Sequence, residues 1–296
     1  MKNEEIKNID IIEFEFDNEN NNVKELHTKK TCIQLNLKNQ NPIVILDIPQ
    51  EEFIKHIGKC EYKFRKGIGI KGEIQRLKFI KKVNNKVSLF HPYRKKNNGH
   101  KLYVDRSKKI QLEIKYIYPY ILSPHLTDKG LKWNEDKTYV IFPYVEGEKQ
   151  PITKDKLEKE SPLLFNYLKQ NRDKLIKQSS YNQRVQNTQE FYGVIRVGLY
   201  TYSDCFVAIR DNTRLNPCIV RKIKTDWGEE KIPLFDGHIS YISQRPDGKF
   251  INCEEARYIW KRLKESEHII LKIFNSRSIS SRLPVKLPIY EKEKEK

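Results

Sequence analysis

Alternating or continuous apolar runs dominate the first third of the chain. Ile9–Phe16 and Thr31–Leu37 alternate apolar with polar residues, and Pro42–Leu46 is a nearly continuous apolar run. Alternation with a period of two is typical of a strand that turns one face toward a core. The Asn-rich stretch Asn18–Asn22 separates the first two runs. These patterns predict β-structure from the N-terminus onward.

Similar β-like runs recur through the rest of the chain. A basic loop containing Asn98 and Gly99, Arg94–His100, lies between two of them. The expected strands after the first three cover Lys86–Phe90, Lys101–Val104, Ile110–Ile117, Gly193–Tyr200, Cys205–Arg210, Cys218–Ile223, His238–Ser243 and His268–Phe274.

Two segments have the apolar spacing of helices. In the first, Ser161 can cap, Pro162 fits the first helical position, and apolar residues recur at helical spacing to Leu175. The face of this helix with Lys169, Arg172 and Lys174 is basic. A capping pattern, Asn252 followed three residues later by Glu255, predicts the start of the second helix. Its apolar face comprises Ala256, Ile259, Trp260 and Leu263.

Many hairpin-like strands with only two clear helices predict an α+β fold with mostly antiparallel sheet, rather than a doubly wound α/β enzyme. We expect a β-rich N-terminal region at 1–110, a connecting segment with a helix at 111–180, a β-rich C-terminal recognition region at 181–290 and a charged tail at 291–296.

The charge of the chain indicates an anionic partner. Its 57 Lys and Arg outnumber its 39 Asp and Glu, which gives a formal charge of +18. Nucleic acid is the first candidate, and the 16 Tyr and 13 Phe suit base stacking beside phosphate contacts. The alternatives are that the lysines reflect an AT-rich genome and are merely solvated, and that the aromatic residues build a β core.

Other partners and compartments are disfavoured. No window approaches the roughly 20 apolar residues of a transmembrane helix, and Met1–Asp10 lacks the apolar run of a signal peptide. We therefore expect a cytoplasmic protein without membrane contact. The five cysteines are widely separated and lack metal-ligand spacing, so we expect reduced, mostly buried thiols: Cys32, Cys60, Cys205, Cys218 and Cys253.

Two short motifs resemble catalytic or cofactor sites. Gly67–Gly72 fits G-x-G-x-x-G, but the preceding residues, Glu61–Lys66, are too polar for a buried parallel strand, which favours a flexible basic loop over a nucleotide site. Asp105, Glu113 and Lys115 fit the D-x(n)-E-x-K pattern of nucleases, in which two carboxylates hold Mg²⁺ and the lysine polarises water. The alternation around Glu113 equally fits a solvent-facing strand.

A methyltransferase that acts on a flipped adenine needs an Asn/Asp-Pro-Pro-Tyr/Phe loop. This chain has only His91-Pro92-Tyr93, Tyr118-Pro119-Tyr120 and Phe142-Pro143-Tyr144, without the leading amide or carboxylate and the double proline. We therefore expect no complete catalytic site and no cofactor, apart from Mg²⁺ if the nuclease pattern is used.

An ordered series of short segments extends over more than half of the chain. They are Glu113 with Tyr118–Leu122, Tyr139–Tyr144, Tyr167–Leu168 through Asn171 and Leu175, Phe191–Val194, Gly198–Tyr202, Phe206–Arg210, Asp236–Ile242 and Ser281–Pro284. In this order they resemble the C-terminal target-recognition domain of adenine-N6 DNA methyltransferases and fused methyltransferase-endonucleases of type II restriction-modification systems. Arg65-Lys66-Gly67-Ile68 is similar to the R-x-G-I stretch that opens such domains.

The resemblance implies that the chain reads duplex DNA as one wall of a cleft. In that family a separate methyl-donor domain with the Asn-Pro-Pro-Tyr loop forms the other wall, and this chain lacks it. Catalysis, and any use of S-adenosylmethionine, would then belong to a methyltransferase or nuclease partner subunit. The chain also fits a fragment of a split methyltransferase gene.

Arginine is the side chain best suited to read guanine, because its guanidinium can bond O6 and N7 together. The residues expected to contact bases or the nearby backbone are Arg184, Arg210, Arg214, Arg221, Gln244 and Arg245. Those expected to contact phosphates are Arg65, Lys66, Lys71, Arg94, Lys95 and Lys96. Two alternatives stay open: a Mg²⁺-dependent restriction endonuclease that uses Asp105, Glu113 and Lys115, and a structural or RNA-binding protein whose charge is generic.

Overall fold

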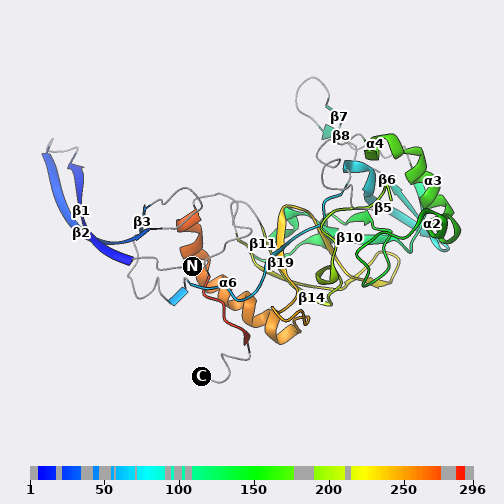
Figure 1. The fold of residues 1–296 in the computed structure, drawn as a ribbon. Helices are drawn as coiled ribbons and strands as arrows, with labels where there is room; N and C mark the ends of the chain where they lie inside the picture. Colours follow the sequence, from blue (N-terminus) through cyan, green and yellow to red (C-terminus); the bar gives the residue numbers. More distant parts are fainter. Residues whose placement is uncertain are drawn as a thin grey trace.

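The structure is a computed structural model with an α+β fold (Figure 1). It describes residues 6–17, 22–34, 43–46, 55–56, 58–70, 72–90, 95–96, 102–103, 109–176, 190–210, 215–274 and 285–290. As the alternating patterns predict, most strands pair in antiparallel fashion. The predicted α+β class with mostly antiparallel sheet is confirmed.

The strands fall into three larger sheets and three short pairs. Strands are β1 Ile6–Asp17, β2 Asn22–Gln34, β3 Ile43–Leu46, β4 Arg65–Lys66, β5 Arg76–Val83, β6 Lys86–Phe90, β7 Lys95–Lys96, β8 Leu102–Tyr103, β9 Lys109–Glu113, β10 Ile117–Ile121, β11 Leu126–Thr127, β12 Gly130–Leu131, β13 Thr138–Ile141, β14 Cys205–Arg210, β15 Cys218–Arg221, β16 Ile223–Lys224, β17 Glu230–Lys231, β18 Leu234–Phe235 and β19 Ile239–Ile242.

Four α-helices and four short 3₁₀ helices are defined among the described residues. The α-helices are α2 Lys154–Glu160, α3 Pro162–Gln170, α4 Arg172–Ile176 and α6 Cys253–Phe274; the 3₁₀ helices are η1 Gly72–Gln75, η2 Ser123–His125, η3 Trp133–Glu135 and η4 Leu199–Thr201. None of the described helices is long and apolar enough to cross a membrane.

The first two strands form an antiparallel hairpin, in which β2 begins well before the expected run at Thr31. β1 pairs with β2 in register from Ile6 opposite Ile33 to Asp17 opposite Asn22, and β3 adds to the other edge of β2. In Figure 1 this three-stranded sheet lies at the far end of the molecule from α2–α4.

The central sheet has six strands in the order β18-β10-β13-β5-β6-β9. The β5–β6 hairpin turns at Asn84, whose φ of 53° is in the left-handed region that asparagine tolerates. β18 joins β10 in parallel, which brings Leu234 beside Tyr120. The sheet therefore combines strands from the expected N-terminal, connecting and C-terminal regions.

A second sheet has four strands in the order β15-β14-β19-β4. Its last strand, β4, comes from the N-terminal third and pairs Arg65 and Lys66 with Tyr241 and Ser240 of β19. Side chains alternate between its two faces. Phe206, Ala208 and Tyr241 belong to a core shared with the central sheet, whereas Val207 and Ile242 belong to the core beneath α6.

Helix α3 begins as its sequence predicts, with Pro162 at the first helical position. The Ser161 side chain makes no cap hydrogen bond, and its buried hydroxyl lacks a partner among the described residues. Leu164 and Leu168 are buried on one face, while Lys169 on another is exposed. The predicted helix is thus confirmed, although it is divided at Asn171 into α3 and α4.

Helix α6 also begins as predicted. The Asn252 side chain accepts a hydrogen bond from the Glu255 amide at 2.9 Å, as a helix-capping asparagine does. Ala256, Ile259 and Leu263 are buried, but Trp260 is 37% exposed and its indole N–H donates to the Pro217 carbonyl. The assignment of Trp260 to the core face was therefore wrong.

Two expected strands are corrected by the structure. The run His268–Phe274 continues α6, because no Gly or Pro interrupts the helix and Ile269 and Ile270 extend its buried stripe. Gly193–Tyr200 is irregular: it makes one bridge, Ile195 to Gly69, after which Arg196 adopts a φ of 64° and η4 begins.

The described cysteines are free thiols. Cys205 and Cys218 are buried, and Cys60 and Cys253 are half-buried, in keeping with the expected reduced state. Burial raises the pKa of the Cys205 and Cys218 thiols to about 11, so both are protonated at neutral pH. The side chain of Cys32 lies outside the described part of the chain.

Candidate nucleic-acid interface

The clearest basic and aromatic grouping lies where β4 joins the four-stranded sheet. The Arg65 guanidinium stands over the Tyr200 ring, 4.6 Å from its centroid. This is the geometry of a cation–π contact. Tyr200 lies in η4, and its carbonyl accepts a hydrogen bond from the Ser243 hydroxyl at 2.7 Å. The arginine is thus held over a ring that is itself fixed to the sheet.

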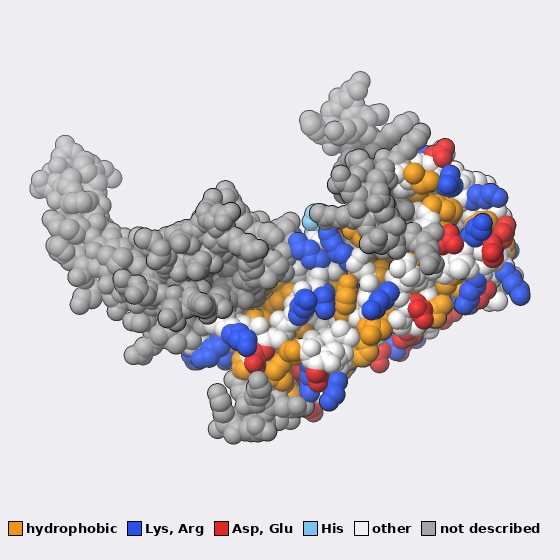
Figure 2. Space-filling view, in the orientation of Figure 1, with side chains coloured by type: hydrophobic (Ala, Val, Ile, Leu, Met, Phe, Trp, Pro, Cys, Tyr) orange, Lys and Arg blue, Asp and Glu red, His pale blue; other side chains and the backbone are white. Residues whose placement is uncertain are grey.

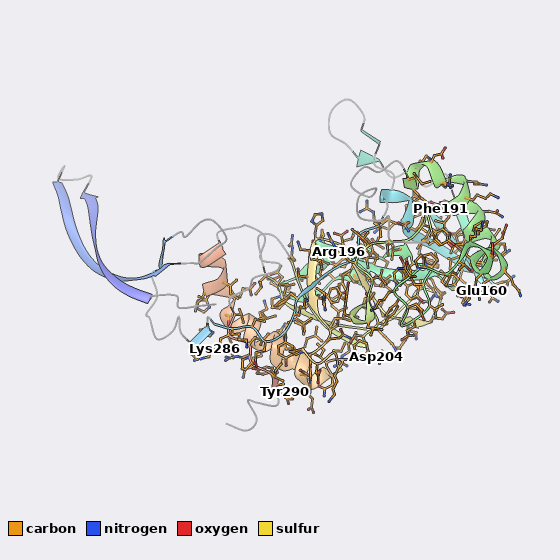
Figure 3. All side chains as sticks on the ribbon, viewed as in Figure 1. Glu160, Phe191, Arg196, Asp204, Lys286 and Tyr290 are labelled. Atoms are coloured by element: carbon orange, nitrogen blue, oxygen red, sulfur yellow. The ribbon has the colours of Figure 1, made fainter. Side chains whose placement is uncertain are left out.

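Arg196 approaches the same place from the irregular segment before η4. Its Nη1 donates weakly to the Gly67 carbonyl at 3.4 Å, and Figure 3 shows Arg196 over the central part of the molecule. Its positive φ is costly for a non-glycine residue, and such backbone strain occurs most often at functional sites. We call Arg65, Arg196 and Tyr200 the arginine–tyrosine cluster.

The pKa of the Tyr200 phenol reflects both the burial and the charge of this cluster. Burial raises this pKa above the ordinary value, and the positive charges of Arg65 and Arg196 oppose the rise. Both arginines are therefore close enough to act on the phenol electrostatically. Beside it, the apolar Leu199 side chain is 50% exposed.

Glycine permits the close packing beneath the cluster. A Cβ built on Gly67 would lie 2.2 Å from the Asp236 carbonyl oxygen, and the Gly67 amide donates to the Ile239 carbonyl at 2.8 Å. The next residue, Ile68, is buried, and Gly69 pairs with Ile195. The expectation of a flexible basic loop at Gly67–Gly72 is therefore wrong for 67–69, where the glycines serve close backbone packing.

Arg210 lies at the same end of the four-stranded sheet as Lys66. Arg210 is opposite Ile239, and the Ile239 carbonyl accepts the Gly67 amide. Arg210, Ile239 and Gly67 therefore form one row across three neighbouring chain segments. The Arg210 Nε atom is buried and has no hydrogen-bond partner among the described residues. Arg65, Lys66 and Arg210, which were predicted on sequence grounds, thus lie toward this end, with Lys66 on the opposite face of the sheet from Arg65. Arg196, which was not predicted, reaches the Gly67 carbonyl.

Three other predicted contacts lie at the opposite end of the sheet. Arg221 ends β15 opposite Cys205 and is exposed, and Gln244 bridges to Phe250. The predicted base contact of Arg245 is corrected by its ion pair. The Arg245 Nε donates to both oxygens of Glu255, at 3.0 and 2.8 Å, and Glu255 is fully buried. This arginine neutralises an interior carboxylate, so its Nε cannot also reach a base.

The side chains of the remaining predicted residues lie outside the described part of the chain. Lys95 and Lys96 form β7, which pairs with β8, but their side chains are outside the described part, as are Lys71, Arg94, Arg184 and Arg214. Figure 2 shows further Lys and Arg side chains spread over the described face of the molecule.

The nuclease pattern is not assembled by the described residues. Both Glu113 oxygens accept backbone hydrogen bonds at 3.0 Å, from the Leu163 and Leu164 amides at the start of α3. Lys115 instead pairs with Glu160 at 2.8 Å. Glu113 therefore caps a helix, and a metal bound to its carboxylate would compete with these two amides for the oxygens. Asp105 lies outside the described residues.

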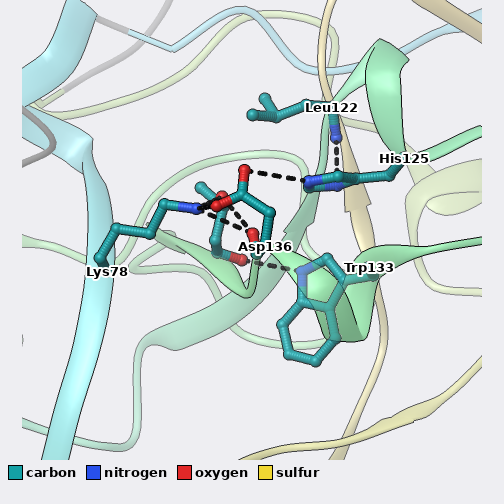
Figure 4. A network of polar contacts seen from close by, with 6 residues as sticks. Lys78, Leu122, His125, Trp133 and Asp136 are labelled. Atoms are coloured by element: carbon teal, nitrogen blue, oxygen red, sulfur yellow. Dashed lines mark hydrogen bonds and ion pairs between the residues drawn. The ribbon is translucent and has the colours of Figure 1, made fainter. Parts of the chain in front are cut away.

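A Lys–Asp–His network beside η3 was a further candidate for chemistry (Figure 4). Lys78 donates to the Asp136 carboxylate and, at 2.7 Å, to the Thr138 hydroxyl. His125 Nδ1 accepts the Leu122 amide at 3.0 Å, and its Nε2 lies 3.6 Å from Asp136. Burial lowers the pKa of His125, which keeps the ring neutral. The network fastens η2 and η3 to β5.

No metal centre is found in the described part of the chain, where no three His, Cys, Asp or Glu side chains gather as ligands. The chain matches no protein-family model, and a search of curated proteins found no significant relative. The arginine–tyrosine cluster and the charge around it are therefore the best indications of function.

Proposed function

We propose that the protein binds duplex DNA in a sequence-specific manner, as the target-recognition subunit of a DNA methylation or restriction-modification system. The observation that carries this proposal is the arginine–tyrosine cluster, where the Arg65 guanidinium lies over a fixed ring and Arg196 bonds the nearby Gly67 carbonyl. Guanidinium forks read guanine edges, and an exposed apolar side chain such as Leu199 suits a thymine methyl.

The position of the cluster favours base reading over general charge attraction, so Arg65, which the sequence suggested as a phosphate contact, is instead proposed to read a base. Arg65 and Arg196 are both half-buried, and each has a contact that limits its rotamers. A side chain that is already ordered loses less entropy on binding and discriminates better between bases. Lysines such as Lys66 would set the register through phosphates, and the formal charge of +18 would supply attraction over longer distances.

Catalysis in this proposal belongs to a partner subunit that carries the Asn-Pro-Pro-Tyr loop and binds S-adenosylmethionine. The use of Glu113 as a helix cap supports this division of labour over the Mg²⁺-dependent nuclease alternative. The genetic expectation is that an adjacent reading frame encodes such a methyltransferase domain. Adenine-N6 methylation of the cognate duplex should then require both polypeptides together.

The proposal is tested by selecting a preferred site from a random duplex library and measuring binding by fluorescence anisotropy. Arg65→Gln and Arg196→Gln should each lose about 1–3 kcal/mol on the selected site and little on scrambled duplex. Arg172→Gln is the matched control, because Arg172 also lies over a ring, that of Phe191 at 5.8 Å, but at α4.

Salt dependence distinguishes DNA binding from generic charge. The logarithm of the binding constant should fall with the logarithm of salt concentration by about 0.9 for each phosphate neutralised. A binding constant that does not change with salt concentration, or equal competition by duplex RNA, would contradict the proposal. Mg²⁺-dependent plasmid cleavage that disappears in Glu113→Ala, with the fold intact, would select the nuclease instead.

A further inference from the structure

A second basic site lies on the outward side of α6, away from its apolar stripe. A pocket of about 590 Å³ is lined by Lys55, His56, Tyr258, Lys261, Arg262 and Glu265. The four helical residues have the spacing i, i+3, i+4 and i+7, which places them on one face. The opposite stripe, with Ala256, Ile259 and Leu263, is buried against the four-stranded sheet.

The charge of the pocket lining fits an anion. Lys55, Lys261 and Arg262 supply three positive charges against the single carboxylate of Glu265, a net charge of +2 with His56 neutral. The Glu265 carboxylate forms two long ion pairs on the same helix, at 3.9 Å to Lys261 and 3.8 Å to Arg262. Neither cation is therefore closely neutralised by it.

The pocket walls are held by neighbouring backbone. Arg262 Nη2 donates to the Lys286 carbonyl at 3.4 Å, and its side chain is 19% exposed. The Tyr258 hydroxyl donates to the Pro288 carbonyl at 3.3 Å. The Lys286 amide in turn donates to the His56 carbonyl at 2.8 Å. The segment around Lys286, labelled in Figure 3, thus links the two sides of the pocket.

His56 reports the positive potential in the pocket. Its Nδ1 lies 3.1 Å from the Ser266 hydroxyl, and its ring packs edge-on against His268. Burial lowers the pKa of His56, and His268, Lys55 and Arg262 lower it further, while Glu265 opposes them. An anion bound among these cations would raise this pKa again.

We propose that this pocket binds a phosphate group. A guanidinium fork and two ammonium groups suit the oxygens of a phosphate dianion, whose charge matches the net charge of the lining. The group could belong to a nucleic-acid backbone or to a small phosphate-bearing molecule. The site is separate from the arginine–tyrosine cluster and does not depend on the function proposed for it.

The first experiment uses sodium phosphate alone on the full-length protein, at constant ionic strength. NMR titration should show a higher His56 pKa as phosphate is added, and saturable binding by calorimetry. Lys261→Gln and Arg262→Gln should each weaken phosphate binding about tenfold, as expected when one charge-assisted hydrogen bond is lost. Lys261 is exposed, so its variant should remain folded even if Arg262→Gln does not.

Lys264→Gln is the matched control, because Lys264 lies on the same helix but pairs with Glu267 at 3.0 Å outside the pocket lining. If it weakens binding equally, or if phosphate leaves His56 unchanged, the site is overturned. A short non-cognate duplex then identifies the source. Competition with phosphate, and weaker duplex binding by Lys261→Gln, supports the backbone; phosphate binding without either supports a small molecule.

Discussion

The ammonium group of Lys231 is buried near the edge of the central sheet. It donates to the Ile114 and Lys115 carbonyls at 2.7 and 2.9 Å and stands 4.8 Å from the centroid of the Tyr118 ring. Burial lowers its pKa from the ordinary value of 10.5 to about 8, although the charge of Glu229 opposes this. The folded state therefore releases this proton at a lower pH than the unfolded chain.

This shift predicts a pH-dependent stability. Between about pH 8 and 10.5 the unfolded chain keeps the Lys231 proton while the folded protein loses it, so the free energy of unfolding should rise with pH. Relative to Lys231→Met, the wild-type protein should gain about 1–3 kcal/mol between pH 7 and 10. Urea unfolding at several pH values measures this; parallel curves for both proteins would contradict it.

The buried pair of Arg245 and Glu255 makes a different prediction. Glu255 also accepts the Tyr62 hydroxyl at 2.6 Å, so the carboxylate joins α6 to the segment before β4. Arg245→Met should destabilise the fold by about 3–5 kcal/mol, because it leaves an interior carboxylate without its cation.

The double variant Arg245→Met, Glu255→Gln is the control for this pair, and it should recover part of that loss in urea unfolding. A stable Arg245→Met protein that has lost only its sequence preference in DNA binding would instead return Arg245 to the base-reading residues.

At the scale of elements, the start of α3 depends on a side chain from a strand. The Glu113 carboxylate at the end of β9 binds two amides that the helix cannot satisfy internally. Glu113→Ala should cost about 1–2 kcal/mol in the free energy of unfolding, and Glu113→Gln, which keeps one acceptor oxygen, should cost less. Equal losses in the two variants would contradict the capping role.

Local patterns predicted only part of the regular structure, and they missed β5, β13 and α2. β6 and β14 occupy the segments that β-like runs indicated, and both predicted helices begin at the expected residues, although only Asn252 makes its capping hydrogen bond. Local patterns failed where distant residues decided the outcome. Ile269 and Ile270 have high β propensity, but packing of their apolar stripe keeps them in α6.

The candidate site was predicted only in part, for the same reason. Arg65, Lys66 and Arg210 followed from charge beside strands, but the stacking of Arg65 on Tyr200 joins residues that are far apart in the chain. Arg196 gave one local signal, a charged residue between two apolar ones in Ile195-Arg196-Val197. Arg245 could not be separated from exposed arginines, because the burial of Glu255 is a tertiary property.

At the scale of the whole molecule, the six-stranded and four-stranded sheets combine strands from distant parts of the chain. In the central sheet, β5 and β6 lie between β13 and β9, which come later in the chain. In the four-stranded sheet, β4 is an edge strand that pairs with β19. A fragment of residues 111–296 should therefore fail to unfold cooperatively, because β13 and β19 lose their partners. Thermal circular dichroism tests this, with 55–296 as the control that keeps both sheets intact.

The pairing of β4 with β19 also has a consequence for biosynthesis. Lys66 leaves the ribosome well before Ser240, its partner 174 residues later. At roughly 5–20 residues per second, this delay is about 10–35 seconds. During that time Arg65 and Lys66 are already synthesised but have no strand to join, so the surface that carries the arginine–tyrosine cluster can be completed only late in translation. A pause before Ile239 would prolong the exposure of this nascent segment to chaperones and proteases.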